Sequence, residues 1–282
     1  MNKVNALFSL IRFELPFSAG ICVVMGQLLA LGFLPSWPAV LLGFLSVFSI
    51  SSSILVLNDY FDLETDKINA PDRPLPSNKI TMTEALMLAF VLLFAGLLFS
   101  YLLGIAAFFC ALFLSLIGFL YNRFFKKSGL PGNLMVSFSV GMTFIYGGIS
   151  VGLPFNKLTW FFGLIAGLID LGEEIAADAM DAEGDKLIHS NSLAIKFGKD
   201  AALNISGLIF LLVILLSILP FVLDWFGMIY LIAFLVMDAF IIYSTLKLLI
   251  YRDERGRIYI RRLYLGATLG IVIFILIRLF GI

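Results

Sequence analysis

The stretch Asn58-Asp59-Tyr60-Phe61-Asp62-Leu63-Glu64-Thr65-Asp66 directly follows a long apolar run of the chain. If the helix of that run continues through it, Asn58, Asp62 and Asp66 are spaced i, i+4 and i+8 and project from one helical face. Oxygen-bearing side chains at a membrane boundary are costly unless they have a partner. Carboxylate and amide oxygens are hard ligands, the kind that Mg²⁺ prefers. The stretch therefore predicts a magnesium site at the end of a membrane helix.

A second acidic cluster follows later in the chain, at Asp178, Asp181 and Asp185. Its spacing of i, i+3 and i+7 again places three carboxylates on one face of a helix. Glu174 lies one helical turn earlier and extends the acidic stripe. Asp170 lies deeper still. It is equally well interpreted as a functional polar group inside the membrane or as a residue at the membrane boundary. Two such faces could hold Mg²⁺ between them, and protein-bound Mg²⁺ commonly also binds substrate phosphates.

The composition indicates a protein built for lipid. Hydrophobic residues make up 61% of the chain, charged residues 13%, and the mean hydropathy is +1.05. Soluble domains have roughly 45–50% apolar and roughly 25% charged residues. The formal net charge is zero, so nothing suggests a nucleic-acid partner. Cys22 and Cys110 both lie in apolar runs and are predicted to be small buried side chains, since disulfide frameworks belong to small secreted domains.

Nine runs have about the 20 apolar residues that a helix needs to cross the hydrocarbon core. They lie at residues 13–32, 38–57, 84–103, 105–122, 133–152, 159–177, 204–223, 226–249 and 263–280. We therefore expect an all-α integral membrane protein, with nine transmembrane helices forming a single domain over residues 1–282. Because an acidic cluster follows both the second and the sixth span, we also expect a pseudo-repeat of about residues 1–130 and 131–250, followed by the ninth helix at 263–280.

The basic residues predict the orientation of these spans. Of all Lys and Arg residues, only Lys157 and Arg278 fall on the side of the membrane opposite the amino terminus. Cytoplasmic loops accumulate Lys and Arg, so the amino terminus and the long loops are expected to face the cytoplasm. Both acidic clusters would then lie on the cytoplasmic side of the cell membrane.

A phosphate group bound through Mg²⁺ would need further cations near the clusters. The loop from Pro71 to Pro76 is stiffened by three prolines, and it could bring Asp72 and Arg73 back over the site. The candidate anion-binding residues are Arg12, Arg73, Tyr121, Asn122, Arg123, Lys126 and Lys127. The basic residues of this set could equally serve only to orient the protein in the membrane. For the basic residues of the loop from Arg252 to Arg262, this orienting role is the favoured interpretation. For Asp59, Glu64 and Asp72 individually, a solvated surface position is equally open; for His189, the single histidine, a solvated loop position is favoured.

The motif Asn58-Asp59-x-x-Asp62-x-x-x-Asp66, with Asp72-Arg73-Pro74 behind it and Asp178-x-x-Asp181-x-x-x-Asp185 later, resembles the motifs of the UbiA superfamily of intramembrane prenyltransferases. The resemblance covers most of the chain. It implies a helical bundle around a central cavity that opens sideways to membrane lipid. It also implies transfer of a prenyl group from a polyprenyl diphosphate to a lipophilic acceptor, without an obligatory protein partner.

The resemblance also implies roles for particular residues. The Mg²⁺ ligands would be Asn58, Asp62, Asp66, Asp178, Asp181 and Asp185. Four of these would be indispensable for catalysis: Asp62, Asp66, Asp178 and Asp181. Apart from the resemblance, their place near the expected site makes the following the predicted diphosphate-binding residues: Arg12, Arg73, Tyr121, Asn122, Lys126 and Lys127.

Within the superfamily, the chain looks most like the archaeal ether-lipid branch, the digeranylgeranylglyceryl phosphate synthases. The resemblance lies in residues 181–185 and in the segment from Tyr121 to Phe144. The chain departs from that branch at Ala177, where the branch tends to have a lysine, and at Met180, where it tends to have an acidic residue. The expected acceptor is geranylgeranylglyceryl phosphate. Alternatives are an aromatic quinone precursor (hydroxybenzoate or dihydroxynaphthoate), a tetrapyrrole, and, outside enzymes, a cation transporter.

Overall fold

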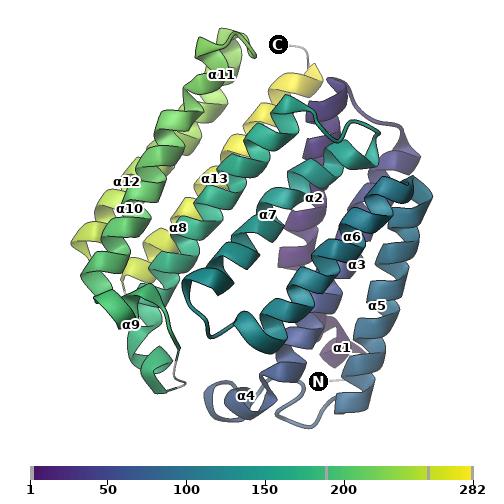
Figure 1. The fold of residues 1–282 in the computed structure, drawn as a ribbon, viewed down its shortest axis with the longest axis vertical. Helices are drawn as coiled ribbons and strands as arrows, with labels where there is room; N and C mark the ends of the chain where they lie inside the picture. The colour runs from purple at the N-terminus through teal and green to yellow at the C-terminus, as the bar shows by residue number, and fades with distance from the viewer. Residues whose placement is uncertain (1–2, 188–189, 253–254, 281–282) are drawn as a thin grey trace. The chain divides into compact units, whose positions relative to one another are not determined.

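The computed structural model describes residues 3–187, 190–252 and 255–280, except for the side chains of Val4, Asn69 and residues 183–187. Within this part of the chain all regular structure is helical. The chain divides into two compact units (Figure 1). Unit 1 comprises residues 1–124 and 142–163, and unit 2 comprises residues 125–141 and 164–282.

Each predicted span overlaps a helix of the structure, although α8 extends well beyond the end of its span and α13 begins before the start of its span. Their bounds are α1 Lys3–Ile11, α2 Glu14–Leu31, α3 Trp37–Phe61, α4 Leu63–Asn69, α5 Met82–Leu103, α6 Ile105–Leu120, the π-helical turn η1 Tyr121–Phe125, α7 Leu130–Ser150, α8 Lys157–Leu187, α9 Leu193–Phe197, α10 Lys199–Ser217, α11 Leu219–Val222, the 3₁₀ turn η2 Met228–Tyr230, α12 Leu231–Ile250 and α13 Gly256–Phe280. The short helices α1 and α9 were not predicted, and the residues of α4 were expected to continue the preceding helix.

Eight stretches of the described residues are helical, long and apolar enough to cross a membrane, and each corresponds to a predicted span. The remaining prediction, residues 159–177, is helical within α8. This helix carries Asp170, Glu173 and Glu174, so it is too polar to count among the eight apolar spans. The prediction of an all-α, multi-pass membrane protein is confirmed, and the count of nine spans stays a prediction.

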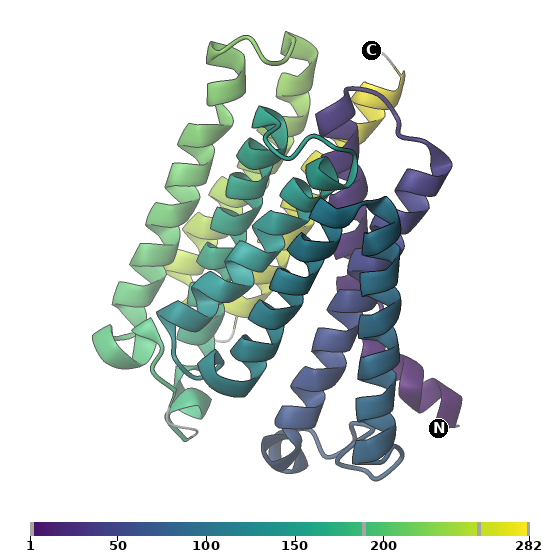
Figure 2. The ribbon, with the colours of Figure 1, turned by 45° about the vertical axis from the view of Figure 1, so that its right-hand side comes forward.

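Unit 1 is built around α3, which packs against α2 and α5 (Figures 1 and 2). A Cβ atom on Gly26 would lie 2.2 Å from the Phe144 carbonyl oxygen, so only glycine permits this close approach. Tyr146 Oη lies 2.9 Å from Ser46 Oγ and donates to Ser100 Oγ at 2.9 Å. Small residues and interhelical hydrogen bonds of this kind hold helices together in lipid, where the hydrophobic effect between helices is absent.

The loop that follows α4 is anchored to unit 1 by its apolar residues. Leu75 and Ile80 are 3% and 1% exposed and belong to a buried cluster with residues of α1, α3 and α5. The next helix, α5, begins with a capping box, in which Thr81 and Glu84 satisfy each other's backbone N–H groups. These contacts anchor the chain directly after Arg73.

In unit 2, α12 packs against α10 and α13 (Figures 1 and 2). Ser206 Oγ of α10 donates to the Gly172 carbonyl oxygen of α8 at 2.7 Å. Ser217 Oγ donates to Asp238 Oδ2 of α12 at 2.7 Å. These bonds tie α10 to two other helices of the unit.

Candidate active site

The first acidic motif lies where α3 gives way to α4. Between the two helices, Asp62 has φ −89° and ψ 1°, so the expectation of one continuous helix through the motif is wrong at this residue. Aspartate is poor inside helices and favoured at their starts because its side chain competes for backbone hydrogen bonds. Helical hydrogen bonds nevertheless persist on both sides, from Asp62 N to Asn58 O at 3.0 Å and from Asp66 N to Asp62 O at 2.8 Å. Asn58, Asp62 and Asp66 therefore still occupy successive turns.

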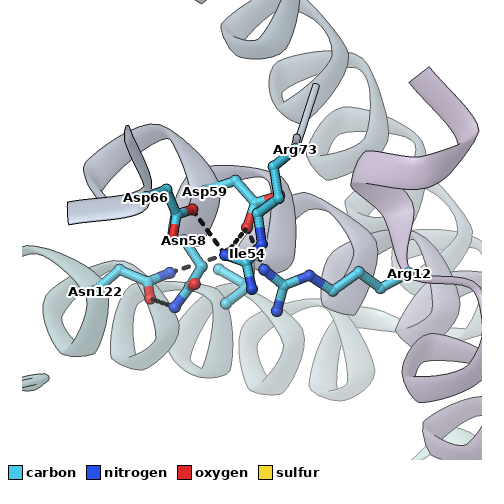
Figure 3. Close-up of polar contacts among 7 residues, drawn as sticks. All are labelled: Arg12, Ile54, Asn58, Asp59, Asp66, Arg73 and Asn122. Carbon is cyan, nitrogen blue, oxygen red and sulfur yellow. Dashed lines mark hydrogen bonds and ion pairs between the residues drawn. The ribbon is translucent and has the colours of Figure 1, made fainter. Parts of the chain in front are cut away.

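Two arginines pair with the carboxylates of this motif (Figure 3). Arg12 Nη2 donates to Asp59 Oδ1. Arg73 Nη1 donates to Asp66 Oδ2 at 2.7 Å and lies 3.7 Å from the same Asp59 oxygen. Asp59 and Asp66 are 4% and 6% exposed, so both carboxylates are buried, whereas their arginine partners are partly exposed. The structure thus places two of the three candidate anion-binding arginines, Arg12 and Arg73, at the first motif.

The acidic surroundings keep Arg73 charged. Burial alone would lower the pKa of Arg73. The hydrogen bond to Asp66 and the charges of Asp66, Asp59 and Asp62 outweigh burial and raise this pKa above its ordinary value. The guanidinium is therefore a permanent cation with five N–H donors at this position.

Asn122 orients Asn58 from the π-helical turn η1. Asn58 Nδ2 donates to Asn122 Oδ1 at 2.9 Å, and Asn122 Nδ2 donates to the Ile54 carbonyl oxygen at 3.0 Å (Figure 3). Single π-helical turns are frequent at functional sites. The Asn58 amide donates this hydrogen bond through its nitrogen. The amide oxygen of Asn58, which is the hard ligand atom, takes no part in it. A contact between Asn122 and diphosphate stays a prediction.

The other predicted anion-binding residues lie in and just after η1. Tyr121 is part of this turn, and Lys126 and Lys127 follow it at the start of unit 2. The Lys127 carbonyl oxygen accepts a hydrogen bond from Asn191 N at 3.0 Å. Nearby, Gly129 has φ +73°, and a Cβ atom there would lie 2.1 Å from the Asn191 carbonyl oxygen. Glycine is thus required for the backbone path that positions these lysines.

The second acidic motif lies on α8, in unit 2. Asp178 Oδ2 accepts a hydrogen bond from Asn133 Nδ2 at 2.9 Å, and Asp181 pairs with Arg257 of α13. Because α8 continues to Leu187, both aspartates share one helix, as predicted. The side chain of Asp185 lies outside the described part of the chain, as does His189.

Two further acids lie earlier on α8. Asp170 Oδ2 accepts a hydrogen bond from Ser137 Oγ at 2.9 Å. Glu173 Oε1 is buried and has no hydrogen-bond partner among the described residues. Asp170 is therefore a partly exposed residue hydrogen-bonded to α7, and a functional role for it inside the membrane stays a prediction.

Residues 19–276 match the model of the UbiA prenyltransferase family. The chain belongs to this family. The digeranylgeranylglyceryl phosphate synthase of Methanococcus aeolicus is 37% identical over 248 residues, which are 88% of each chain. That of Methanocaldococcus jannaschii is 35% identical over 250 residues, which are 88% of this chain and 87% of the relative. The family membership confirms that the protein is a prenyltransferase.

Solved structures agree with this assignment. A structure described as digeranylgeranylglyceryl phosphate synthase in membranes has a TM-score of 0.81 and 32% sequence identity, and the match covers 98% of both chains. A UbiA homolog from Archaeoglobus fulgidus bound to GPP and Mg²⁺ has a TM-score of 0.69 and 16% identity, covering 97% of this chain and 99% of that one. The second likeness shows the fold, and the UbiA fold predicted from the motifs is confirmed.

The chemistry of the first motif fits Mg²⁺ in this UbiA family member. Within the described residues, no three His, Cys, Asp or Glu side chains are close enough together to form a metal cage. Mg²⁺ rarely needs such a cage, since it binds through one or two carboxylates together with substrate phosphates and water. The amide oxygen of Asn58 and the carboxylates of Asp62 and Asp66 supply that kind of donor set.

Three residues at the motifs were not singled out as candidate site residues from the sequence. Asp59 was left open as a surface residue, and it is the buried partner of Arg12. Arg257 belongs to a basic loop that was attributed to membrane orientation, yet it pairs with Asp181. Asn133 donates to Asp178; from the sequence it was noted only within the segment from Tyr121 to Phe144 that resembles the ether-lipid branch, without a role of its own.

Proposed function

We propose that this UbiA family member transfers a geranylgeranyl group from its diphosphate to the free hydroxyl of geranylgeranylglyceryl phosphate. The observation that carries the proposal is similarity over nearly the full chain to relatives named digeranylgeranylglyceryl phosphate synthase. The match extends through both acidic motifs rather than covering only the membrane spans. The acidic and basic side chains at the motifs supply what a diphosphate substrate requires.

The proposed metal ligands are Asn58, Asp62 and Asp66 in unit 1 and Asp178, Asp181 and Asp185 in unit 2. Bound Mg²⁺ supplies positive charge that stabilises the departing diphosphate. That the two motifs serve one diphosphate stays a prediction. It is tested by whether Asp66→Asn and Asp178→Asn each raise the Mg²⁺ concentration needed for half-maximal rate.

The two arginines at the first motif are proposed to donate hydrogen bonds to the diphosphate. Arg12 and Arg73 are partly exposed, with side-chain exposures of 31% and 40%. Each guanidinium has five N–H donors, and the contacts with Asp59 and Asp66 involve only one nitrogen of each. Tyr121, Lys126 and Lys127, together with Asn122, are the further proposed diphosphate contacts.

Cleavage of the allylic C–O bond releases the diphosphate and leaves an allylic carbocation. The acceptor hydroxyl oxygen then bonds to this cation to form the ether and gives up its proton to the released diphosphate or to water. Water would quench this cation, so the proposed reaction requires an apolar cavity that excludes water. Aromatic rings stabilise cations by ~0.5–2 kcal/mol each, and 15% of the chain is aromatic. By the distribution of Lys and Arg, we propose that the amino terminus and the reaction face the cytoplasm.

The decisive experiment incubates the purified protein with Mg²⁺, radiolabelled geranylgeranyl diphosphate and one acceptor at a time. The acceptors are geranylgeranylglyceryl phosphate, hydroxybenzoate, dihydroxynaphthoate and a tetrapyrrole, with Asp62→Ala as the inactive control. We expect label to enter only the glycerol lipid. Transfer to an aromatic or tetrapyrrole acceptor instead overturns the acceptor assignment. Cation flux into proteoliposomes without any prenyl diphosphate would favour a transporter.

A further inference from the structure

Two arginines from distant parts of the chain meet at a single oxygen atom of Asp59. Arg12 comes from the junction of α1 and α2, and Arg73 comes from the proline-rich loop after α4. Arg12 Nη2 donates to Asp59 Oδ1, and Arg73 Nη1 lies 3.7 Å from the same oxygen (Figure 3). Two guanidinium groups this close repel each other unless an anion lies between them. Asp59 supplies that anion.

We propose that Asp59 is a positioning residue, which holds Arg12 and Arg73 in place for the diphosphate before the substrate arrives. The inference rests on the proposed function, in which both arginines bind the diphosphate. Ordering long side chains at the moment of binding costs conformational entropy. A buried carboxylate that has already ordered both guanidinium groups removes this cost from the binding step.

The backbone at Arg12 supports this role independently of the side-chain contacts. Arg12 has φ +49°, in the left-handed region, where residues other than glycine are uncommon. Such a conformation persists only when the surrounding structure holds it. It interrupts the helix between Ile11 and Glu14, and it places the Arg12 guanidinium on Asp59.

The burial of Asp59 distinguishes a positioning role from the alternative that its carboxylate competes with the diphosphate for the arginines. The Asp59 side chain is 5% exposed, whereas those of Arg12 and Arg73 are 31% and 40% exposed. The Asp59 carboxylate is therefore much more buried than either arginine, and both arginine side chains keep an exposed portion. A competing anion would have to lie on the exposed side.

Hydrogen exchange of the unaltered protein provides the first test. The amides of Leu15 and Phe17 donate to the carbonyl oxygens of Arg12 and Phe13 at 3.1 and 3.0 Å, so they report on the junction. The probe is S-geranylgeranyl thiolodiphosphate with Mg²⁺, an analogue whose sulfur resists departure. If Asp59 has already ordered the junction, these amides are protected without the probe and change little when it binds. Protection that arises only with the probe overturns the proposal.

The second test compares Asp59→Asn with Glu64→Gln, a matched control that also removes one acidic charge from this region. Glu64 is 83% exposed and pairs with Lys67 rather than with either arginine. For Asp59→Asn we expect the probe to bind about tenfold more weakly, which corresponds to ~1.4 kcal/mol. Exchange at Leu15 should rise in parallel, Asp59→Glu should restore part of the affinity, and Glu64→Gln should match the unaltered protein.

The outcomes separate this inference from the proposed function. Binding to Asp59→Asn as tight as to the unaltered protein, or tighter, overturns the positioning role and leaves the proposed function intact. If the unaltered protein fails to bind the probe in the presence of Mg²⁺, both the proposed function and the role of Asp59 are overturned.

Discussion

Replacing Asp66 with asparagine separates the role of this residue in catalysis from its role in stability. The substitution keeps the size of the side chain and removes its charge. Asp66 is 6% exposed and accepts a hydrogen bond from Arg73 Nη1 at 2.7 Å. It is also a proposed metal ligand, so the substitution tests two contributions of different magnitude.

The loss of stability is expected to be small. Hydrogen bonds to charged groups contribute ~1.5–3 kcal/mol each. Arg73 is 40% exposed and keeps Asp59 as a second partner, which reduces the expected loss to about 1 kcal/mol because solvent screens exposed pairs. The loss of activity is expected to be much larger. Removing one group that stabilises developing charge slows catalysis by roughly 10²–10³-fold.

The assay measures label transfer from radiolabelled geranylgeranyl diphosphate, alongside the melting temperature in the same detergent. We expect Asp66→Asn to melt within a few degrees of the unaltered protein while its transfer rate falls by at least about a hundredfold. Glu64→Gln, which removes an exposed charge from the same short helix, should leave both quantities unchanged. Near-normal transfer by folded Asp66→Asn protein would refute the assignment of Asp66 to the metal site.

Three further predictions follow from the same contacts. Asn122→Ala removes the hydrogen bond that orients the Asn58 amide. The transfer rate should therefore fall by ~10–100-fold, as it does when other residues that orient metal ligands are replaced. A transfer rate at low Mg²⁺ equal to that of the unaltered protein contradicts this role. Asn133→Ala removes the hydrogen-bond donor to Asp178, so the Mg²⁺ concentration needed for half-maximal rate should rise. Ser139→Ala, a control substitution on the same helix, should leave that concentration unchanged. Treatment with EDTA should abolish transfer and added Mg²⁺ should restore it, whereas a rate that is indifferent to chelation counts against a metal-dependent reaction.

Hydropathy and spacing were sufficient to predict the spans because lipid imposes a length and an apolar composition on each helix. The same reasoning failed at the ends of helices, where polar residues decide. Asp62 interrupts the helix after Phe61, and an aspartate followed by a short polar segment was the available signal for a helix start. At α8, by contrast, the helical spacing of the second acidic cluster correctly predicted that the helix continues beyond the apolar run ending at residue 177, and it extends to Leu187.

The ion-pair network of the first motif could not be derived from the sequence in the same way. Arg12 and Arg73 were candidates because of their charge, but their common partner depends on how α1 and the proline-rich loop pack. Leu75, buried at 3% exposure, anchors that loop. Asp59 looked equally suited to the surface because local spacing cannot show which carboxylate of a motif faces inward.

The charges of the first motif explain why the substrate and the metal should bind together. Asp59, Asp62 and Asp66 bring three negative charges, and Arg12 and Arg73 bring two positive charges, which leaves the network with one negative charge. Charges interact strongly where protein and lipid exclude water. A diphosphate approaching alone is therefore repelled, whereas a divalent cation reverses the sign of the site. The two arginines lower the cost of the buried carboxylates in the metal-free protein, and they keep their remaining donors for the diphosphate once the metal has made the site positive.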